Sequence, residues 1–168
     1  GPPWRRFEPL RLVGNCCDWR SEQEGLAFAP PEASEGGWRH HQLCFRMLSI
    51  EVEFQVISER LGFEWRLFPK DRGDSGHPPR AGAEQLARLG GEQDGHGHNF
   101  RVRESLLSVV MLSVWLPDSV GPSTLARESF VGASLDEPFV TYAVVRSGGD
   151  TTPRPSVAIG AAEVRYPL

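Results

Sequence analysis

The stretch IEVEFQVI, residues 50–57, decides the fold class because it alternates apolar and polar side chains. Successive side chains of a β-strand point to opposite faces, so every second residue lies on the same face. One face holds the apolar residues Ile50, Val52, Phe54 and Val56, and the other holds Glu51, Glu53 and Gln55. This pattern predicts an antiparallel strand with one face in a core and the other in solvent.

Segments on both sides of this stretch have strand-like patterns separated by Gly, Pro and Asn. We expect further strands at residues 8–13, 38–47, 62–68, 139–145 and 157–166, and a hairpin formed by residues 99–103 and 107–116. Residues 82–89 are expected to form one or two helical turns. Many short strands without alternating helices predict an all-β antiparallel sandwich rather than an α/β fold.

The composition is that of a soluble globular protein. The chain has 168 residues, of which 39% are hydrophobic and 24% charged, which suits one domain with or without an extension. A net charge of −4 disfavours nucleic acid as the main partner, since phosphate binding requires a basic surface. No apolar run approaches the roughly 20 residues that span a bilayer, so we expect no membrane insertion. The compartment is not indicated.

The three cysteines are interpreted as ordinary thiols. Cys16 and Cys17 are adjacent, which strains a disulfide between them and does not fit the usual spacing of metal ligands. The alternative is a bridge from Cys44 to one of the two. No nucleophile elbow or phosphate-binding loop occurs, so we expect neither catalysis nor a cofactor.

His96 and His98 raise the alternative of a metal site. Two histidines one residue apart share a face of an extended segment and can bind one ion. The spacing from Gly90 to His96 resembles a cupin metal motif, but Glu104 falls one residue too far along, and His77 is the only nearby candidate for a third histidine ligand. We interpret these histidines as polar loop residues and keep a cupin-like metal enzyme as an alternative.

Among the five tryptophans, Trp19 and Trp65 are the best candidates for ligand contacts. Trp19 follows a turn after the first expected strand, and Trp65 stands between Glu64 and Arg66. We expect both rings to have an exposed face. Sugar rings stack on such flat aromatic faces by the same contacts that order aromatic pairs.

Five segments, taken in order, resemble starch-binding carbohydrate-binding modules of families 20 and 48. These segments are LRLVGNCCDW (10–19), GGWRHHQLCF (36–45), IEVEFQVI (50–57), GFEWRLFP (62–69) and HNFRVRESLLSVVMLSVW (98–115). The resemblance covers about residues 8–116. It implies that the sandwich is immunoglobulin-like and that the chain binds an α-glucan without catalysis.

In that family two tryptophans and an asparagine contact the sugar. Carried onto this sequence, the resemblance implies Trp19, Trp65 and Asn99 as ligand-binding residues, with Gln55 and Glu64 as weaker candidates.

Two departures from the family pattern set the expected domain organisation. The loop at residues 69–98 is longer than usual, and residues 117–168 have no counterpart. We therefore expect a sandwich over residues 1–116 and an extension over 117–168 that packs on it, its strand at 139–145 extending a sheet edge. These departures keep open a second function, in which the sandwich is a structural or interaction subunit that binds a protein partner in a larger, for example organellar, assembly.

Overall fold

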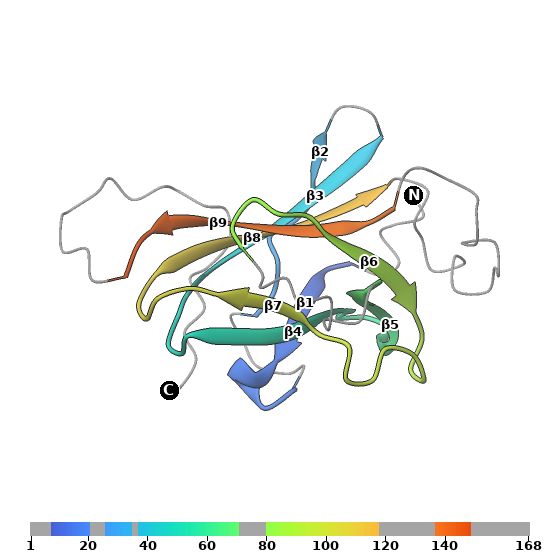
Figure 1. Cartoon of the computed structure of the whole chain (residues 1–168). Coiled ribbons are helices and arrows are strands. Elements are labelled where there is room, and N and C mark those ends of the chain that lie inside the picture. Colours follow the sequence, from blue (N-terminus) through green and yellow to red (C-terminus); the bar gives the residue numbers. More distant parts are fainter. Residues whose placement is uncertain (1–7, 21–25, 35–36, 71–79, 118–136, 149–168) are drawn as a thin grey trace.

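A computed structural model describes residues 8–20, 26–34, 37–70, 80–117 and 137–148 (Figure 1). These residues form nine strands and one short 3-10 turn. Their bounds are β1 (Leu10–Gly14), η2 (Asn15–Cys17), β2 (Glu32–Ser34), β3 (Trp38–Arg46), β4 (Glu51–Ser58), β5 (Gly62–Pro69), β6 (Gln85–Gly90), β7 (Phe100–Arg103), β8 (Val109–Pro117) and β9 (Phe139–Arg146).

The strands form an antiparallel sandwich of two layers joined through one strand. Their order is β1-β4-β5-β6-β9-β8-β3-β2, and β7 pairs with the part of β4 that β5 leaves free. One layer holds β1, β4, β5 and β7, and the other holds β2, β3, β8 and β9 (Figure 1). β6 pairs with β5 through one half and with β9 through the other. The expected all-β antiparallel sandwich is confirmed.

The core lies between the two layers, as the alternation of β4 predicts. Val52, Phe54 and Val56 are completely buried. From the opposite layer, Leu43 on β3 and Leu112 on β8 belong to the same buried cluster. Ile50 is 65% exposed because it lies in the turn before β4 and not in the strand itself.

Two local predictions are wrong. Residues 82–89 contain no helical turn, since most of this stretch belongs to β6, where Ala87 and Leu89 are buried with the strand period of two. The expected hairpin does not form either, because β7 pairs with β4 whereas β8 pairs with β3 and β9. The turn between them, with Leu107 at φ 67°, carries the chain from one layer to the other, so the apolar faces of these two strands both face the core.

The regions that depart from the starch-binding pattern also contribute strands. The long connection 69–98 contains β6, which lies between β5 and β9 and so joins the two layers. Residues 71–79 of this connection lie outside the described part. β9 confirms the strand expected at 139–145, but it lies between β6 and β8 rather than at a sheet edge. The strand expected at 157–166 lies outside the described residues.

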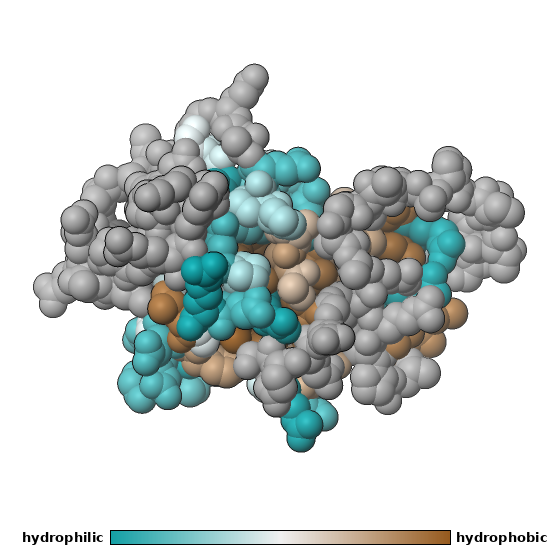
Figure 2. Space-filling model, turned by 180° about the vertical axis from the view of Figure 1, so that it is seen from behind, coloured by the Kyte–Doolittle hydropathy of each residue, from teal (hydrophilic) through white to brown (hydrophobic). Residues whose placement is uncertain are grey.

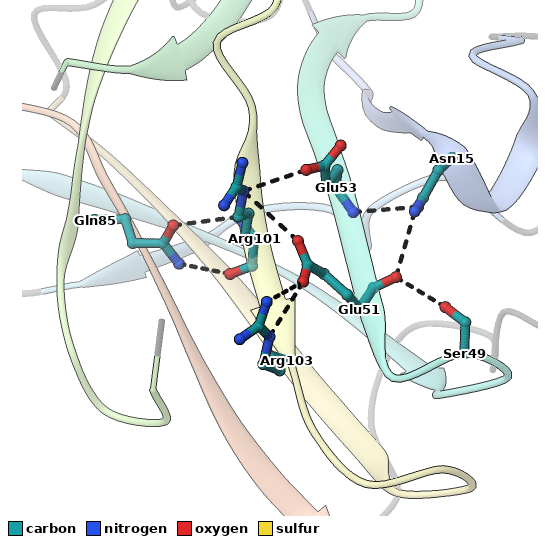
Figure 3. A network of polar contacts seen from close by, with 7 residues as sticks. All are labelled: Asn15, Ser49, Glu51, Glu53, Gln85, Arg101 and Arg103. Carbon is teal, nitrogen blue, oxygen red and sulfur yellow. Dashed lines mark hydrogen bonds and ion pairs between the residues drawn. The ribbon is translucent and has the colours of Figure 1, made fainter. Parts of the chain in front are cut away.

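The outer face of β4 carries charges that β7 neutralises (Figure 3). Arg101 lies 3.3 Å from Glu53, and Arg103 lies 2.6 Å from Glu51. On the other edge of β7, the side-chain amide of Gln85 donates to the carbonyl of Arg101 and accepts from its N–H, at 3.0 and 3.3 Å. This side chain satisfies an edge backbone that would otherwise be open to pairing with another chain.

A histidine is buried on β3 beside a carboxylate. His41 is 1% exposed, and its Nε2 lies 3.4 Å from Glu8 Oε1. Burial lowers the pKa of His41 to about 3, and the charges of Arg39 and His40 act in the same direction. The imidazole is therefore neutral in the folded protein at neutral pH.

We expect the free energy of unfolding to fall as the pH drops below the ordinary histidine pKa of about 6.5. Between about pH 6.5 and pH 3 the unfolded chain binds a proton at His41, whereas His41 of the folded chain stays unprotonated. The free energy of unfolding therefore falls by about 1.4 kcal/mol per pH unit in this interval. In urea unfolding at a series of pH values, the free energy of unfolding should depend less steeply on pH in His41→Gln than in the parent. The exposed His96→Gln is the control, and equal slopes in the parent and His41→Gln would contradict the assignment.

Candidate functional site

A pocket of about 620 Å³ opens beside the outer faces of β4 and β5. Three parts of the chain form it: the turn after β1, the two strands themselves and the connection between β6 and β7. Its lining residues are Trp19, Gln55, Phe63, Arg66, Glu92, Gln93, His96, Gly97 and Asn99. The lining therefore combines aromatic rings with hydrogen-bonding side chains.

The η2 turn places Trp19 at the pocket. Asp18 and Trp19 both have left-handed backbones, with φ of 51° and 60°, and the Trp19 N–H donates to the carbonyl of Gly14 at 2.9 Å. The turn reverses the chain so tightly that the indole comes back beside β4, where it is 38% exposed. Two left-handed non-glycine residues cost backbone energy, which the surrounding contacts must offset.

Asn15 fixes this turn to β4 (Figure 3). Its amide nitrogen donates to the Glu51 carbonyl at 3.3 Å, and its amide oxygen accepts from the Glu53 N–H at 3.1 Å. The side chain thereby extends the β1–β4 ladder one step beyond the last paired residue, Gly14. Gly14 is required because a Cβ there would overlap the carbonyl oxygen of Glu53.

The cysteines lie under this turn as free, buried thiols. Cys16 and Cys17 are at most 4% exposed and belong to the core cluster. The Cys17 thiol donates to the Gly14 carbonyl at 3.4 Å, and this hydrogen bond stabilises the turn on its core side. A hydrogen bond with Cys17 and burial together raise the pKa of Cys16, so its thiol is neutral. No disulfide joins Cys44 to Cys16 or Cys17, so the alternative bridge is not formed in this structure.

Gln55 and Arg66 form the buried polar floor of the pocket. They are 3% and 4% exposed, and Arg66 Nη1 donates to Gln55 Oε1 at 3.3 Å. Gln55 Nε2 donates to the carbonyls of Gly95 at 2.7 Å and His98 at 2.9 Å. Arg66 Nη2 donates to the Glu92 carbonyl at 2.7 Å. These bonds hold residues 92–98 over the sheet, and they occupy both amide hydrogens of Gln55.

The two histidines of the His-x-His pair point to different surroundings. The segment is not extended, since Gly95 and Gly97 have φ of 75° and 78° and turn the chain twice. His96 is exposed at the pocket, whereas the His98 ring packs edge-on against Phe68 at 6.3 Å. In the described residues no group of three or more His, Cys, Asp or Glu could hold a metal ion, and His77 lies outside them. The metal alternative therefore has no support from this arrangement.

Three of the five expected ligand-binding residues line this pocket: Trp19, Gln55 and Asn99. The expected exposure of Trp65 is wrong, since its side chain is completely buried. Trp65 shares the inward face of β5 with Leu67, and pairing with β4 fixes which face of β5 points inward. Glu64 is exposed but lies outside the pocket lining.

Sequence reasoning missed Phe63, Arg66, Glu92 and Gln93 and considered His96 only as a metal ligand. A signal for Arg66 was present, because it interrupts the apolar stretch of β5 at a position that the structure buries. Its guanidinium also lies 5.0 Å from the centre of the Phe63 ring, so the two residues shape this side of the pocket together.

Comparisons with known protein families, curated proteins and solved structures give no match for this chain. Among the described residues, no helix has the length and apolar character needed to cross a bilayer.

Asn15→Ala is expected to lower the free energy of unfolding by about 1–2 kcal/mol and to release Trp19, since both hydrogen bonds to β4 are lost. Urea unfolding measures the first effect, and a shift of the Trp19 indole N–H signal in NMR measures the second. Ser49→Ala is a matched control, because Ser49 Oγ donates to the same Glu51 carbonyl at 2.8 Å from outside the turn. An unchanged Trp19 signal in Asn15→Ala would contradict the role of Asn15.

Gln55→Leu is expected to loosen residues 91–99 while the sandwich stays folded. Two hydrogen bonds to buried carbonyls are lost, so amide hydrogen exchange in this segment should accelerate by roughly tenfold or more. Gln42→Leu on the opposite layer makes a similar chemical change at a half-buried position and should leave the segment protected. Equal protection of residues 91–99 in Gln55→Leu and the parent would show that other contacts hold them.

Proposed function

We propose that this chain is a non-catalytic carbohydrate-binding module that binds an α-glucan at the pocket of Trp19. The observation that carries the proposal is the meeting of Trp19 and Asn99 at one open pocket. They are 80 positions apart (99 − 19) in the sequence and were both implied as sugar contacts by the resemblance to starch-binding modules.

The chemistry of the lining supports this proposal. The Trp19 ring is partly exposed and offers a flat surface on which a sugar ring can stack. Around it, Asn99, Gln93 and His96 offer hydrogen-bond donors and acceptors for hydroxyl groups. An aromatic surface with such groups at its border recognises both the apolar face and the polar rim of a pyranose.

The roles within the site differ from residue to residue. Trp19 stacks and Asn99 hydrogen-bonds the sugar, whereas Gln55 acts as a positioning residue because both of its amide hydrogens already bind backbone carbonyls. Trp65 supports the site only from the core.

The number of carboxylates in the pocket lining favours binding over glycoside hydrolysis. Hydrolysis generally requires two carboxyl groups that flank the scissile bond. Among the described residues that line this pocket, Glu92 is the single carboxylate.

Trp19→Ala is expected to abolish retardation of the protein in a native gel that contains amylose, because it removes the stacking surface. Trp38→Ala is the control, since it removes a half-buried indole from β3 in the opposite layer and should leave retardation unchanged. Thermal unfolding establishes that both variants are folded. A parent protein that runs equally fast with and without amylose would overturn the proposed function.

An interaction subunit is the second candidate, and one observation favours it. Ile50, Leu106 and Leu107 are 44–65% exposed in two turns that meet at one end of the sandwich, where the Glu104 N–H donates to the Ile50 carbonyl at 3.2 Å. The face shown in Figure 2 also has hydrophobic residues that reach the surface beside polar ones. Exposed apolar area of this kind is typical of protein contacts. A subunit with this function alone would pass the amylose gel unretarded, with or without Trp19.

A further inference from the structure

Arg66 is a buried cation whose hydrogen bonds to described residues all go to uncharged oxygens. Its acceptors are the Phe63 carbonyl at 3.4 Å, Gln55 Oε1 at 3.3 Å and the Glu92 carbonyl at 2.7 Å. Four other arginines of the described part reach a carboxylate within 4.0 Å: Arg11 with Glu59, Arg39 with Glu8, Arg101 with Glu53 and Arg103 with Glu51. Arg66 forms no ion pair of this kind with a described residue.

A buried charge without a close counter-ion is costly, so proteins rarely keep one without a purpose. Arg66 is 4% exposed and still belongs to the lining of the pocket. A guanidinium has five N–H groups. Three of them donate to the sheet and to the connection above it, and one on each Nη has no hydrogen bond to a described residue.

The nearest acids compensate this charge only from a distance. Burial lowers the pKa of Arg66, and the charges of Asp94 and Glu92 oppose that shift. Both acids are exposed, and an Asp94 oxygen accepts from the Gly91 N–H at 2.8 Å. Solvent screens such exposed charges, whereas an oxyanion inside the pocket would contact the guanidinium directly.

We propose that the glycan bound at this pocket carries an acid group, either a phosphate monoester or a carboxylate, and that Arg66 pairs with it at the pocket floor. This inference rests on the proposed function, since it presupposes that the pocket binds a glycan. Among the other lining groups, Asn99, Gln93 and His96 can supply N–H donors to an oxyanion or to the hydroxyls beside it, whereas the Glu92 carboxylate repels an oxyanion.

The test compares three matched ligands by isothermal titration of the whole chain at low ionic strength. The ligands are maltoheptaose, maltoheptaose with a phosphate monoester at C6, and maltoheptaose oxidised to a carboxylate at C6. We expect an acid-bearing ligand to bind about tenfold more tightly than the neutral one, as a charge-assisted contact with arginine allows. Added salt should weaken binding of the acid-bearing ligand more than that of maltoheptaose. The two acid-bearing arms show whether phosphate or carboxylate geometry is preferred.

Substitutions at Arg66 and Arg88 test whether the tighter binding of the acid-bearing ligand depends on Arg66. Arg66→Met should remove the advantage of the acid-bearing ligand, and Arg66→Lys should keep only part of it, since lysine lacks the planar fork. Arg88→Met removes the same charge from an exposed position of β6 outside the pocket and should leave the advantage intact. If Arg66→Met does not fold, the ligand and salt comparisons on the parent still decide.

The possible failures are distinguishable. Equal affinity of the parent for all three heptaoses would overturn the role of Arg66 and leave the proposed glycan binding in place. Absence of binding to all three would overturn the proposed function and this inference together. An advantage of the acid-bearing ligand that persists in Arg66→Met would overturn the assignment to Arg66.

Discussion

The fold and the candidate site both depend on the two faces of β4. Its inward residues Val52, Phe54 and Val56 are completely buried, and its edges are paired with β1 on one side and with β5 and β7 on the other. Because the core fixes which residues face inward, it also fixes which face outward. Gln55 is therefore held at the floor of the pocket, and the Glu53 backbone is held where its N–H binds the Asn15 side chain.

The second constraint is the cost of burying Gln55 and Arg66. A polar group taken out of water must find partners inside the protein, and a guanidinium needs more of them than an amide. The partners come from the connection between β6 and β7, whose carbonyls at Glu92, Gly95 and His98 accept from these two side chains. The sheet thus determines where a connection without regular structure lies, and this connection supplies half of the pocket.

Period-two alternation was enough to predict most of the sandwich. It placed β3 and β4 close to their observed bounds, as short strand-like stretches did for β5 and β9. It failed at β6, where Leu86 and Leu89 suggested a helical spacing, although Ala87 and Leu89 are the residues that the structure buries. Pairing between strands was also out of reach, because neighbouring stretches such as β7 and β8 can belong to different layers.

The candidate site shows the same division between local and long-range information. Trp19 was expected from a local pattern, a turn after a strand, and the resemblance to starch-binding modules implied both Trp19 and Asn99. The burial of Trp65 depends on which face of β5 turns inward, and the pairing of β5 with β4 fixes that face. The position of Arg66 beneath residues 92–98 depends on a contact across 26 positions of sequence. No local sequence pattern indicates the burial of Trp65 or the position of Arg66 beneath residues 92–98.

Three contacts explain how the tight turn after β1 is held. Gly14 allows the close approach to Glu53, Asn15 completes the ladder to β4, and the buried thiol of Cys17 binds the Gly14 carbonyl. Together these contacts offset two left-handed residues and hold an indole partly in solvent, although an indole gains free energy by burial. The same turn therefore packs Cys16 and Cys17 into the core and holds the Trp19 ring at the pocket, where the proposed function places a sugar.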